Sequence, residues 1–501
     1  MCNMLLAIGV VIWYNIAICI CSAEPAGSMK RRTNNMRSLK AVLSCILAAA
    51  MSMTMFACGG AEEEVSMKDI SADVRQQIID LATNDPNLTG ELENKTVKWM
   101  SPWDINPSDG SGKSTPLDLA IFQERYGGEI QWYQVNHNTR YDDLANAINS
   151  DEGIDFFFGG DGDAFPKGAL RGMFVPYDGY IDLESELWAD VKDANEGIAW
   201  QGKHYLAVTD ITGDNCAVIY NRKTIEEAGL DDPAELFAEG EWDWDAFEEM
   251  LEEFCDSSAQ KYGIDSWYYE IGLSQTTGVP YIGLEDGVLV NNLRDPDLER
   301  VQDWIYDLYT KDYIALGNGD YGWTSNPNYI GEGKLLFHPC GTWAIGNDTW
   351  KETFGEDMFF VPMPKDPESD VHYVAGKMNA YLFVKGGHNP EGAAKYLDCL
   401  RFSKMSDEVR EMDNQKLRDD YGWTDEMIEM ANTMNEMALE NPTFDFYIGV
   451  SSDITDVLDS SVNGIRATAH GVPWAESVNA IDAQIQNFVD EVNEEAAASA
   501  E

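Results

Sequence analysis

Basic residues are scarce in this chain. Among its 501 residues, 34 are lysine or arginine and 88 are aspartate or glutamate, so the formal net charge at pH 7 is −54. A surface of this sign repels nucleic acid and anionic lipid headgroups, because both carry negatively charged phosphates. We therefore expect no nucleic-acid partner, and we expect phosphorylated or sulfated ligands to be disfavoured.

Signatures of several enzyme classes are absent. The sequence has no G-x-S-x-G, H-E-x-x-H or P-loop pattern, and its six histidines occur singly. Carboxylate pairs, which glycosidases use, are inevitable among 88 acidic residues and so carry little information. We expect a protein that is not an enzyme and needs no cofactor, with a carbohydrate-active hydrolase as a remote alternative.

Metal-binding cysteine motifs are missing from the body of the chain. Of nine cysteines only four follow Cys58, and these lack a C-x-x-C pair or a histidine at metal spacing (Cys216, Cys255, Cys340 and Cys399). No structural zinc site is predicted. One or two disulfides and buried free thiols both remain open, because the sequence does not say which cysteines pair.

Long apolar runs occur only near the N-terminus. A basic segment, Met29–Lys40, precedes an apolar stretch, Ala41–Met55, which ends in Phe56-Ala57-Cys58. A small residue before a cysteine at this place resembles a bacterial lipobox, which implies that Cys58 becomes the lipidated first residue of the mature protein. A plain transmembrane anchor is the alternative. No apolar span of membrane length follows Cys58, so we place the remainder outside the membrane.

The first 28 residues contain a separate apolar run. They come before a methionine that basic residues follow directly, so we expect translation to begin at Met29, or at Met36. Residues 1–57 would then form the leader region. Residues 58–94 would hold the lipidated cysteine, a tether and a first helix.

The body of the chain begins with alternating strands and helices. Strands are predicted at 95–100, 130–135 and 154–158, with helices near 117–126 and 141–148 between them. Gly127 and Gly128 would end the first of these helices. This βαβαβ order predicts a parallel sheet with right-handed crossovers, and thus an α/β fold.

Two loops lie beyond the carboxyl ends of these strands, where ligands bind in such sheets. The first contains Trp103 and Asp104, and the second contains Asp161 and Asp163. We predict that both loops contact ligand. The alternative for the aspartates is turn formation or helix N-capping. An Asp-x-Asp loop also suits calcium, but the remaining ligands of a Ca²⁺ loop are absent, so no metal site is predicted.

Later segments read as further strands and capped helices. Ala217–Tyr220 has the pattern of a short buried strand, and Leu335–Phe337 is a second apolar run. Asp243 is placed to cap a helix. Asn389 is an N-cap followed by proline at the first helical position, which favours a helix start there.

Five degenerate motifs occur in order along this region. They read GKHYLAV from Gly202, YNRKTIEEAGL from Tyr220, WDWDAF from Trp242, GEGKLLFHPCGTW from Gly331 and NPEGAAKYLDCL from Asn389. Together they resemble the extracellular solute-binding proteins of bacterial ABC importers, whose best-known members, of the maltose-binding type, bind sugars. The resemblance covers roughly residues 95–492.

The resemblance also implies site residues. In the family, a tryptophan in the turn that Trp343 occupies stacks on a sugar ring, which implies this role for Trp343; a core position beneath the turn is the alternative. Sugar-binding relatives supply an acid and an aromatic from the region after Gly263, and the corresponding candidates are Trp267, Tyr268 and Glu270. Asn379 is placed to face the cleft. Trp323, in an aromatic loop, is a further candidate, with packing under its own turn as the alternative.

The implied architecture is a two-lobed periplasmic-binding-protein-like fold. Each lobe is a mostly parallel sheet flanked by helices, and a hinge of two or three crossings joins the lobes, the first near Ala207–Asp214. The segments are expected to alternate, with 95–209 and 363–440 in lobe 1 and 210–362 and 441–495 in lobe 2. Residues 496–501 are expected to be a disordered tail.

These observations predict a carrier. We expect a lipid-anchored monomer on the extracellular face of a bacterial cell membrane that captures a carbohydrate, an oligosaccharide, between its lobes and delivers it to an ABC transporter permease. Aromatic rings suit the apolar face of a pyranose, and Asp and Asn suit its hydroxyls. Acids and rings also suit a polyamine or other organic cation, which is the alternative. The sequence does not name the sugar, its length or its linkage.

Overall fold

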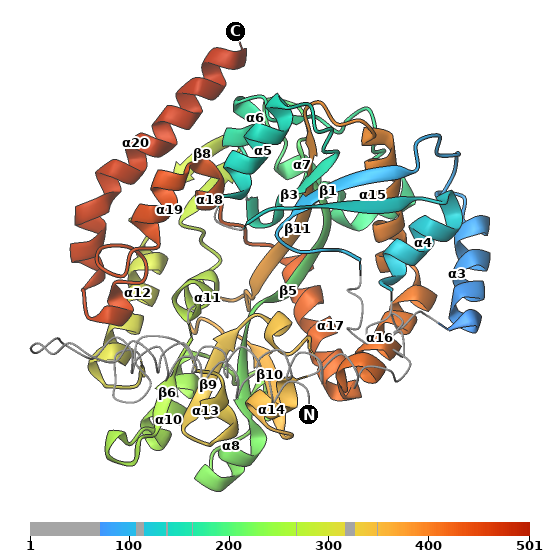
Figure 1. Ribbon diagram of the computed structural model, residues 1–501. Helices are drawn as coiled ribbons and strands as arrows, with labels where there is room; N and C mark the ends of the chain where they lie inside the picture. Colours follow the sequence, from blue (N-terminus) through green and yellow to red (C-terminus); the bar gives the residue numbers. More distant parts are fainter. Residues whose placement is uncertain are drawn as a thin grey trace, which may run out of the picture. The chain divides into compact units, whose positions relative to one another are not determined.

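The structure is a computed structural model of the chain (Figure 1), and it describes residues 71–106, 115–136, 139–162, 164–266, 268–315, 326–347 and 349–500. These residues belong to one compact unit, Ser66–Glu501. The leader and Cys58 lie outside the described residues, as do the candidate site residues Asp163, Trp267 and Trp323.

The first part of the unit alternates strands and helices after a leading helix. The elements are α3 (Ala72–Asn84), β1 (Thr96–Ser101), α4 (Leu117–Tyr126), β2 (Glu129–Gln134), α5 (Arg140–Asn149) and β3 (Phe156–Phe158). Strand β1 pairs in parallel with both β2 and β3, so the predicted βαβαβ unit is confirmed. Helix α4 ends where predicted, because Gly127 adopts the left-handed conformation that glycine allows without strain.

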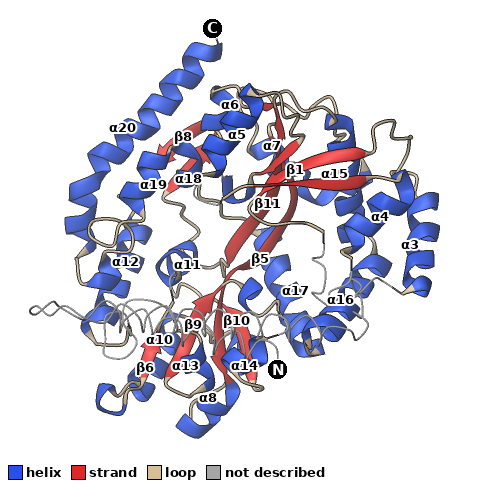
Figure 2. Cartoon of the chain, in the orientation of Figure 1, coloured by secondary structure: helices blue, strands red, loops and turns tan. Residues whose placement is uncertain are grey.

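One long strand, β5 (Leu206–Asn221), belongs to both halves of the sheet and joins them (Figure 2). Its first part pairs with β11 (Ala375–Val384), and its last five residues pair with β9 (Leu335–Cys340) and β10 (Met358–Pro362), all antiparallel. The prediction of a short strand at Ala217–Tyr220 is therefore wrong in its length. The polar residues between Thr209 and Asn215 interrupt the apolar pattern, and the pairing with β11 shifts register twice along them, but the strand continues through both irregularities.

Short strands and many helices complete the unit. The strands are β4 (Phe174–Val175), which pairs with β11, β6 (Tyr262–Ile264), which pairs with β9, and the hairpin β7 (Ile282–Glu285) and β8 (Val288–Asn291). The helices are α6 (Lys167–Leu170), α7 (Lys192–Gly197), α8 (Arg222–Ala228), α9 (Pro233–Glu239), α10 (Trp244–Phe254), α11 (Tyr269–Gln275), α12 (Pro296–Thr310), α13 (Asn328–Gly331), α14 (Trp350–Phe354), α15 (Pro390–Met405), α16 (Asp407–Tyr421), α17 (Asp425–Glu440), α18 (Tyr447–Val450), α19 (Ser452–Leu458) and α20 (Trp474–Ala500). Short 3-10 helices are η1 (Gly160–Gly162), η2 (Glu186–Val191), η3 (Ser257–Ala259), η5 (Thr342–Ala344) and η6 (Thr468–His470).

Both predicted helix caps are confirmed. The side chain of Asp243 accepts from the backbone N–H of Ala246, and that of Asn389 accepts from the N–H of Gly392 at 2.9 Å. The C-terminal tail, expected to be disordered, is helical up to Ala500, because α20 continues through the run of alanines and glutamates, which are strong helix formers.

Two clusters of buried side chains hold these elements together. The smaller packs α3, α4 and α15 against one side of β1 and β3, with Phe122, Phe156 and Leu397 among its members. The larger continues along β5 into β9, β10, α10, α12 and α20. Because this larger core follows β5 from one end to the other, the polar residues in the middle of that strand interrupt an otherwise apolar stretch.

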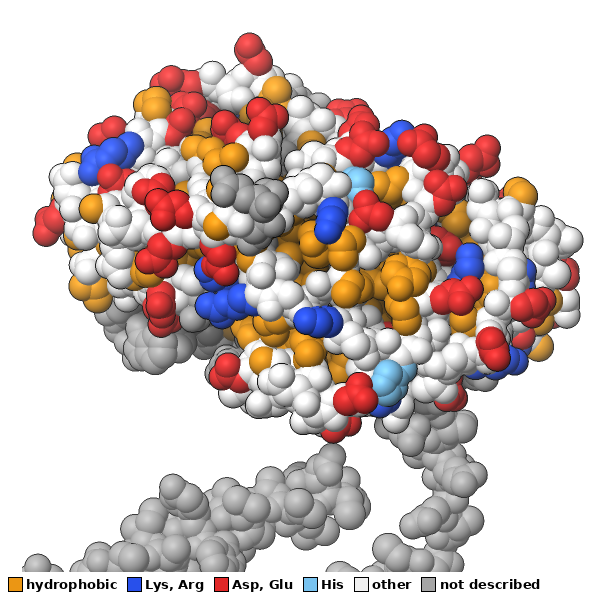
Figure 3. Space-filling model, turned by 90° about the horizontal axis from the view of Figure 1, so that it is seen from above, with side chains coloured by type: hydrophobic (Ala, Val, Ile, Leu, Met, Phe, Trp, Pro, Cys, Tyr) orange, Lys and Arg blue, Asp and Glu red, His pale blue; other side chains and the backbone are white. Residues whose placement is uncertain are grey.

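Acidic side chains are spread widely over the face seen in Figure 3, and lysines and arginines are fewer there. This distribution agrees with the excess of acidic residues in the sequence. Among the described residues, no group of three or more His, Cys, Asp or Glu side chains is arranged to hold a metal ion.

Candidate functional site

The middle of β5, from Thr212 to Asn215, is where several candidate side chains meet. The Nδ2 of Asn379, on β11, lies 3.5 Å from the hydroxyl of Thr212. The Nδ2 of Asn215 donates to the hydroxyl of Tyr268, just before α11, at 3.1 Å. Two residues that the resemblance singled out, from segments more than 100 positions apart, therefore converge on one short stretch of strand.

Trp343 stands beside this stretch. It lies in η5, directly after β9, and its side chain is 59% exposed, so it is not a core residue. A Cβ at Gly341 would overlap Nε1 and Cδ1 of the indole and would lie 3.0 Å from the carbonyl oxygen of Asn215. Gly341 thus leaves room for the indole to lie against the backbone, with its other side open. An exposed ring in this position offers a flat apolar surface to a ligand.

Helix α17 packs on the same stretch from another direction. The Oδ1 of Asn435 accepts from the N–H of Gly213 at 2.9 Å, and a Cβ at Gly213 would overlap the carbonyl of Met434. Gly213 therefore allows the helix to approach the strand backbone closely. Sequence reasoning missed Asn435 and Asn215, because each is a single amide in an unremarkable local pattern and only the fold brings them together.

Glu270 is buried rather than open. It is 2% exposed, and among the described residues its Oε2 has no hydrogen-bond partner. Its nearest charged neighbour is Arg466, whose Nη1 lies 3.5 Å from that oxygen. Burial raises the pKa of Glu270 to about 7, although the positive charge of Arg466 opposes the shift. Glu270 therefore has a counterion, the partly exposed Arg466, and does not present an open face.

Arg466 connects Glu270 to a second carboxylate, the half-buried Asp459. Burial raises the pKa of Asp459, and Arg466 opposes that shift too. The hydroxyl of Tyr447 donates to Asp459 Oδ1 at 3.0 Å. Two carboxylates thus share one guanidinium behind the first turn of α11. The sequence carried no signal for this cluster, because its members come from three separate segments.

The loop after β1 contains an exposed aromatic ring, Trp103, and a carboxylate that is already hydrogen-bonded, Asp104. Trp103 is 45% exposed, and its ring contacts Phe158 edge-on with a centroid separation of 5.1 Å. The Oδ1 of Asp104 accepts from both the backbone N–H and the Nδ2 of Asn106, at 3.0 and 2.9 Å. Asp104 therefore forms a turn, which was the alternative to ligand binding that the sequence left open. The ring of Trp103 is exposed.

The loop after β3 approaches β11. The N–H of Gly159 donates to the carbonyl of Ala380 at 2.9 Å, and a Cβ at Gly160 would lie 2.9 Å from the carbonyl of Met378. The backbone of Asp161 is in η1, which places this residue near the β11 segment that also carries Asn379. The structure thus brings the β3 loop to the same strand as Asn379, while Tyr268 and the turn of Trp343 each lie against Asn215, farther along β5.

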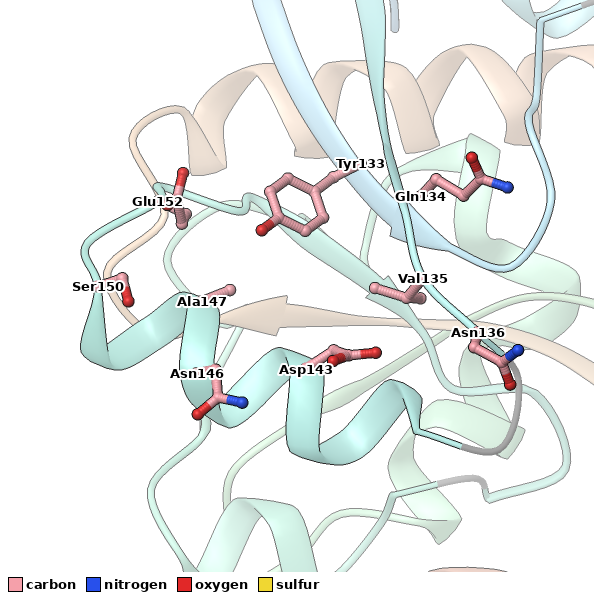
Figure 4. A pocket seen from close by; sticks show the side chains of 9 residues that line it. All are labelled: Tyr133, Gln134, Val135, Asn136, Asp143, Asn146, Ala147, Ser150 and Glu152. Atoms are coloured by element: carbon pink, nitrogen blue, oxygen red, sulfur yellow. The ribbon is translucent and has the colours of Figure 1, made fainter.

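A surface pocket of about 470 Å³ lies elsewhere, between β2 and α5 (Figure 4). Tyr133 lines it from β2 and Val135 from the residue just after the strand, while Asp143 and Asn146 line it from α5. None of the candidate site residues lines it, so this pocket is separate from the candidate site.

The four cysteines of the body form no disulfide in the described part of the chain, and Cys216, Cys340 and Cys399 are buried. Burial raises the pKa of the Cys216 thiol well above its usual value. These cysteines therefore behave as small core residues. No helix within the described ranges has both the length and the hydropathy that crossing a bilayer requires.

Known structures with the same fold bind sugars or related polyols. The cyclic α-maltosyl-1,6-maltose binding protein from Arthrobacter globiformis is 13% identical, with a TM-score of 0.57 over 79% of this chain and 99% of that one. A solute-binding protein from Thermotoga lettingae bound with α-D-tagatose is 15% identical, with a TM-score of 0.55 over 79% and 100%. One from Listeria monocytogenes in complex with cycloalternan is 14% identical, with a TM-score of 0.54 over 81% and 98%.

At these identities the structures show the fold, which is the predicted two-lobed periplasmic-binding-protein-like α/β fold. No curated protein sequence matches the chain. The family model described as bacterial extracellular solute-binding protein matches residues 106–404, which is more than half of the sequence. The chain therefore belongs to the bacterial extracellular solute-binding protein family.

Proposed function

We propose that this protein binds a carbohydrate, an oligosaccharide, between its two lobes and delivers it to an ABC transporter permease. The observation that carries the proposal is the exposed indole of Trp343, held against Gly341 beside the polar middle of β5. A pyranose has an apolar C–H face that suits such a ring, and its hydroxyls need hydrogen-bonding partners close by.

Polar partners of the required kind surround the ring. The backbone carbonyl of Asn215 lies against Gly341, beside Trp343, and the Asn215 amide donates to the hydroxyl of Tyr268, while the amide of Asn379 lies elsewhere along β5. Trp103 adds a second exposed ring on the β1 side. Two exposed rings on separate elements favour an oligosaccharide over a single sugar unit, since an oligosaccharide offers each ring its own sugar residue to stack on.

In this proposal, residues 95–209 and 363–440 form one lobe and residues 210–362 and 441–495 form the other. The crossing near Ala207–Asp214 lies within β5, which supports a hinge in that strand. Ligand would stabilise the closed form by its higher affinity for that form.

Lipid at Cys58 would keep the protein on the extracellular face of the membrane, close to its permease. The protein would act as a monomer, without catalysis and without a cofactor. The remaining candidates, Asp161, Asp163, Trp267 and Trp323, are proposed to complete the ligand site. Glu270 is proposed to act from behind it through Arg466.

The experiment is a binding survey on residues 59–501 with intrinsic tryptophan fluorescence and thermal shift. The panel contains maltose-type and other oligosaccharides, monosaccharides, polyols and polyamines. A saturable response to an oligosaccharide supports the proposal. A response only to polyamines would show that the ligand is an organic cation and not a sugar. Release of reducing ends from any glycan would show that the protein is an enzyme.

A further inference from the structure

The pocket between β2 and α5 has the form of a groove that follows the helix (Figure 4). Helix α5 and its C-cap line it with residues spaced three or four positions apart, which lie on one helix face (Asp143, Asn146, Ala147 and Ser150). At 1.5 Å per residue this face is about 10 Å long. The volume of about 470 Å³ lies within the range of about 300 to 1,000 Å³ that is usual for small-ligand sites. We call this pocket the β2–α5 groove.

Strand β2 supplies an aromatic wall to the groove. The strand stands at the edge of the sheet, next to β1. Figure 4 shows the ring of Tyr133 extending from β2 toward the side of the groove where Ser150 and Glu152 lie. Tyr133 is half-buried, and the buried side chains of Val135 and Ala147 form an apolar floor. The groove therefore offers a ring face and an apolar base to a ligand.

Amides are the most frequent polar side chains in the lining of the groove. Three of them contribute, namely Gln134, Asn136 and Asn146. An amide group both donates and accepts hydrogen bonds, as the hydroxyl groups of a sugar do. An ammonium group, in contrast, only donates, and would leave the N–H groups of the amides unused. The amides therefore favour a ligand rich in hydroxyl groups over an organic cation.

Two carboxylates add strong acceptors toward the two ends of the helix. Asp143 lies in the first turn of α5, and its Oδ2 accepts from the hydroxyl of Thr139 at 2.7 Å. Glu152 follows the helix, and its backbone carbonyl accepts from the Nζ of Lys98. Within the described residues the carboxylate of Glu152 has no hydrogen-bond partner of its own. Carboxylates bind hydroxyl groups through short, charge-assisted hydrogen bonds.

We propose that the β2–α5 groove is a second ligand site, apart from the candidate site around Trp343, and that it binds a linear stretch of a carbohydrate. The ring of Tyr133 stacks on the C–H face of one sugar unit, while Asn146 and Glu152 bind its hydroxyls. The length of the helix face suits a chain more than a compact monosaccharide. This site goes beyond the proposed function, because it does not require binding at Trp343.

The first test measures trisaccharide binding in a Trp343→Ala background, which removes the ring of the candidate site. Saturation-transfer NMR titrations use maltotriose, cellotriose and mannotriose. Asn146→Ala and Asn149→Ala are a matched pair, because both amides are exposed on α5 and only Asn146 lines the groove. We expect one trisaccharide or more to bind, and Asn146→Ala to weaken this binding about fivefold or more. No binding, or equal binding in the two variants, would overturn the proposal.

The second test identifies the wall and the ligand class. In the same background Tyr133→Ala should abolish the trisaccharide signal, whereas Tyr180→Ala should retain it, and melting temperatures show whether each variant is folded. Spermidine binding that Asp143→Asn abolishes, without a trisaccharide signal, would make the groove a cation site and refute a carbohydrate there.

The two proposals fail separately. Binding that depends on Asn146 supports the groove even if Trp343 contributes nothing to sugar affinity in the parent protein. Sugar binding that Trp343→Ala abolishes entirely supports the proposed function and refutes the groove.

Discussion

Asn215 donates a hydrogen bond to the hydroxyl of Tyr268 at 3.1 Å, and this contact joins the middle of β5 to the start of α11. The carbonyl of the same Asn215 lies against Gly341, the residue that the indole of Trp343 covers. One residue of the long strand therefore sets the positions of two side chains that the ligand is proposed to meet. This arrangement leads to specific expectations for substitutions.

Gly341→Ala should displace the indole of Trp343. The new methyl group would overlap the ring, so the ring must rotate away from the site, while folding is little affected because Trp343 is largely exposed. We expect a loss of sugar affinity of about tenfold or more, about 1.4 kcal/mol, by titration calorimetry. Gly179→Ala is the matched control, because no atom lies within 4 Å of the added carbon. Equal affinities for the two variants would disprove the role of Gly341.

Tyr268→Phe should weaken ligand binding modestly. The change removes the acceptor of Asn215 Nδ2 and leaves the ring in place, at a cost of about 1 kcal/mol for one hydrogen bond. We expect roughly a fivefold rise in the dissociation constant. The melting temperature without ligand serves as the control, and a fall in that temperature with unchanged affinity would make the contact purely structural.

Glu270 should make stability depend on pH. Its pKa is 4.5 as an isolated group and about 7 in the fold, because burial disfavours the charged carboxylate. Between these values the folded protein holds a proton that the unfolded chain has lost, so the free energy of unfolding falls as pH rises from about 4.5 to 7. Glu270→Gln removes this dependence.

Urea unfolding at pH 4.5, 6 and 7.5 measures the effect. The stability of Glu270→Gln relative to the parent protein should increase along this series, whatever its sign at the starting pH. Asp445 remains in both proteins and its pKa is also raised to about 7 by burial, so its contribution cancels in the difference. A constant difference across the series would show that Glu270 keeps its ordinary pKa.

Asn389→Ala should destabilise the fold without altering the ligand site. Asn389 caps α15 and donates from Nδ2 to the carbonyls of Asn94 and Thr96 at 2.7 and 3.0 Å. Losing a cap and two buried hydrogen bonds costs roughly 3 kcal/mol. Asn389→Ser restores the cap alone and should recover about 1 kcal/mol. Chemical denaturation checks both values. Under conditions where the variant is fully folded, its sugar affinity should match that of the parent protein.

Local sequence patterns were sufficient to predict several helices and strands and to single out part of the candidate site. The βαβαβ unit, the caps at Asp243 and Asn389 and the stop at Gly127 depend on neighbouring residues, so the sequence alone predicts them. Trp343 could be singled out because its turn carries a recognisable motif. The length of β5 could not be predicted, since β11, its partner on both sides of the polar middle, is distant in sequence.

The remaining parts of the site depend on tertiary packing. Nothing near Glu270 in the sequence indicates that Arg466, nearly 200 positions later, becomes its counterion. Gly213 likewise has no local turn to explain it, and its reason appears only where the carbonyl of Met434 lies against it. Charges and glycines whose partners are distant in the chain were therefore missed.

The most direct measurement is a calorimetric titration of the best oligosaccharide of the panel into the parent protein, Trp343→Ala and Tyr180→Ala. Tyr180 is an exposed aromatic ring outside the site, 44% exposed against 59% for Trp343. The account predicts that Trp343→Ala, folded and with an unchanged melting temperature, loses affinity at least tenfold, while Tyr180→Ala binds as the parent does. Unchanged affinity in Trp343→Ala would contradict the account, because its central ring would then make no contact with the ligand.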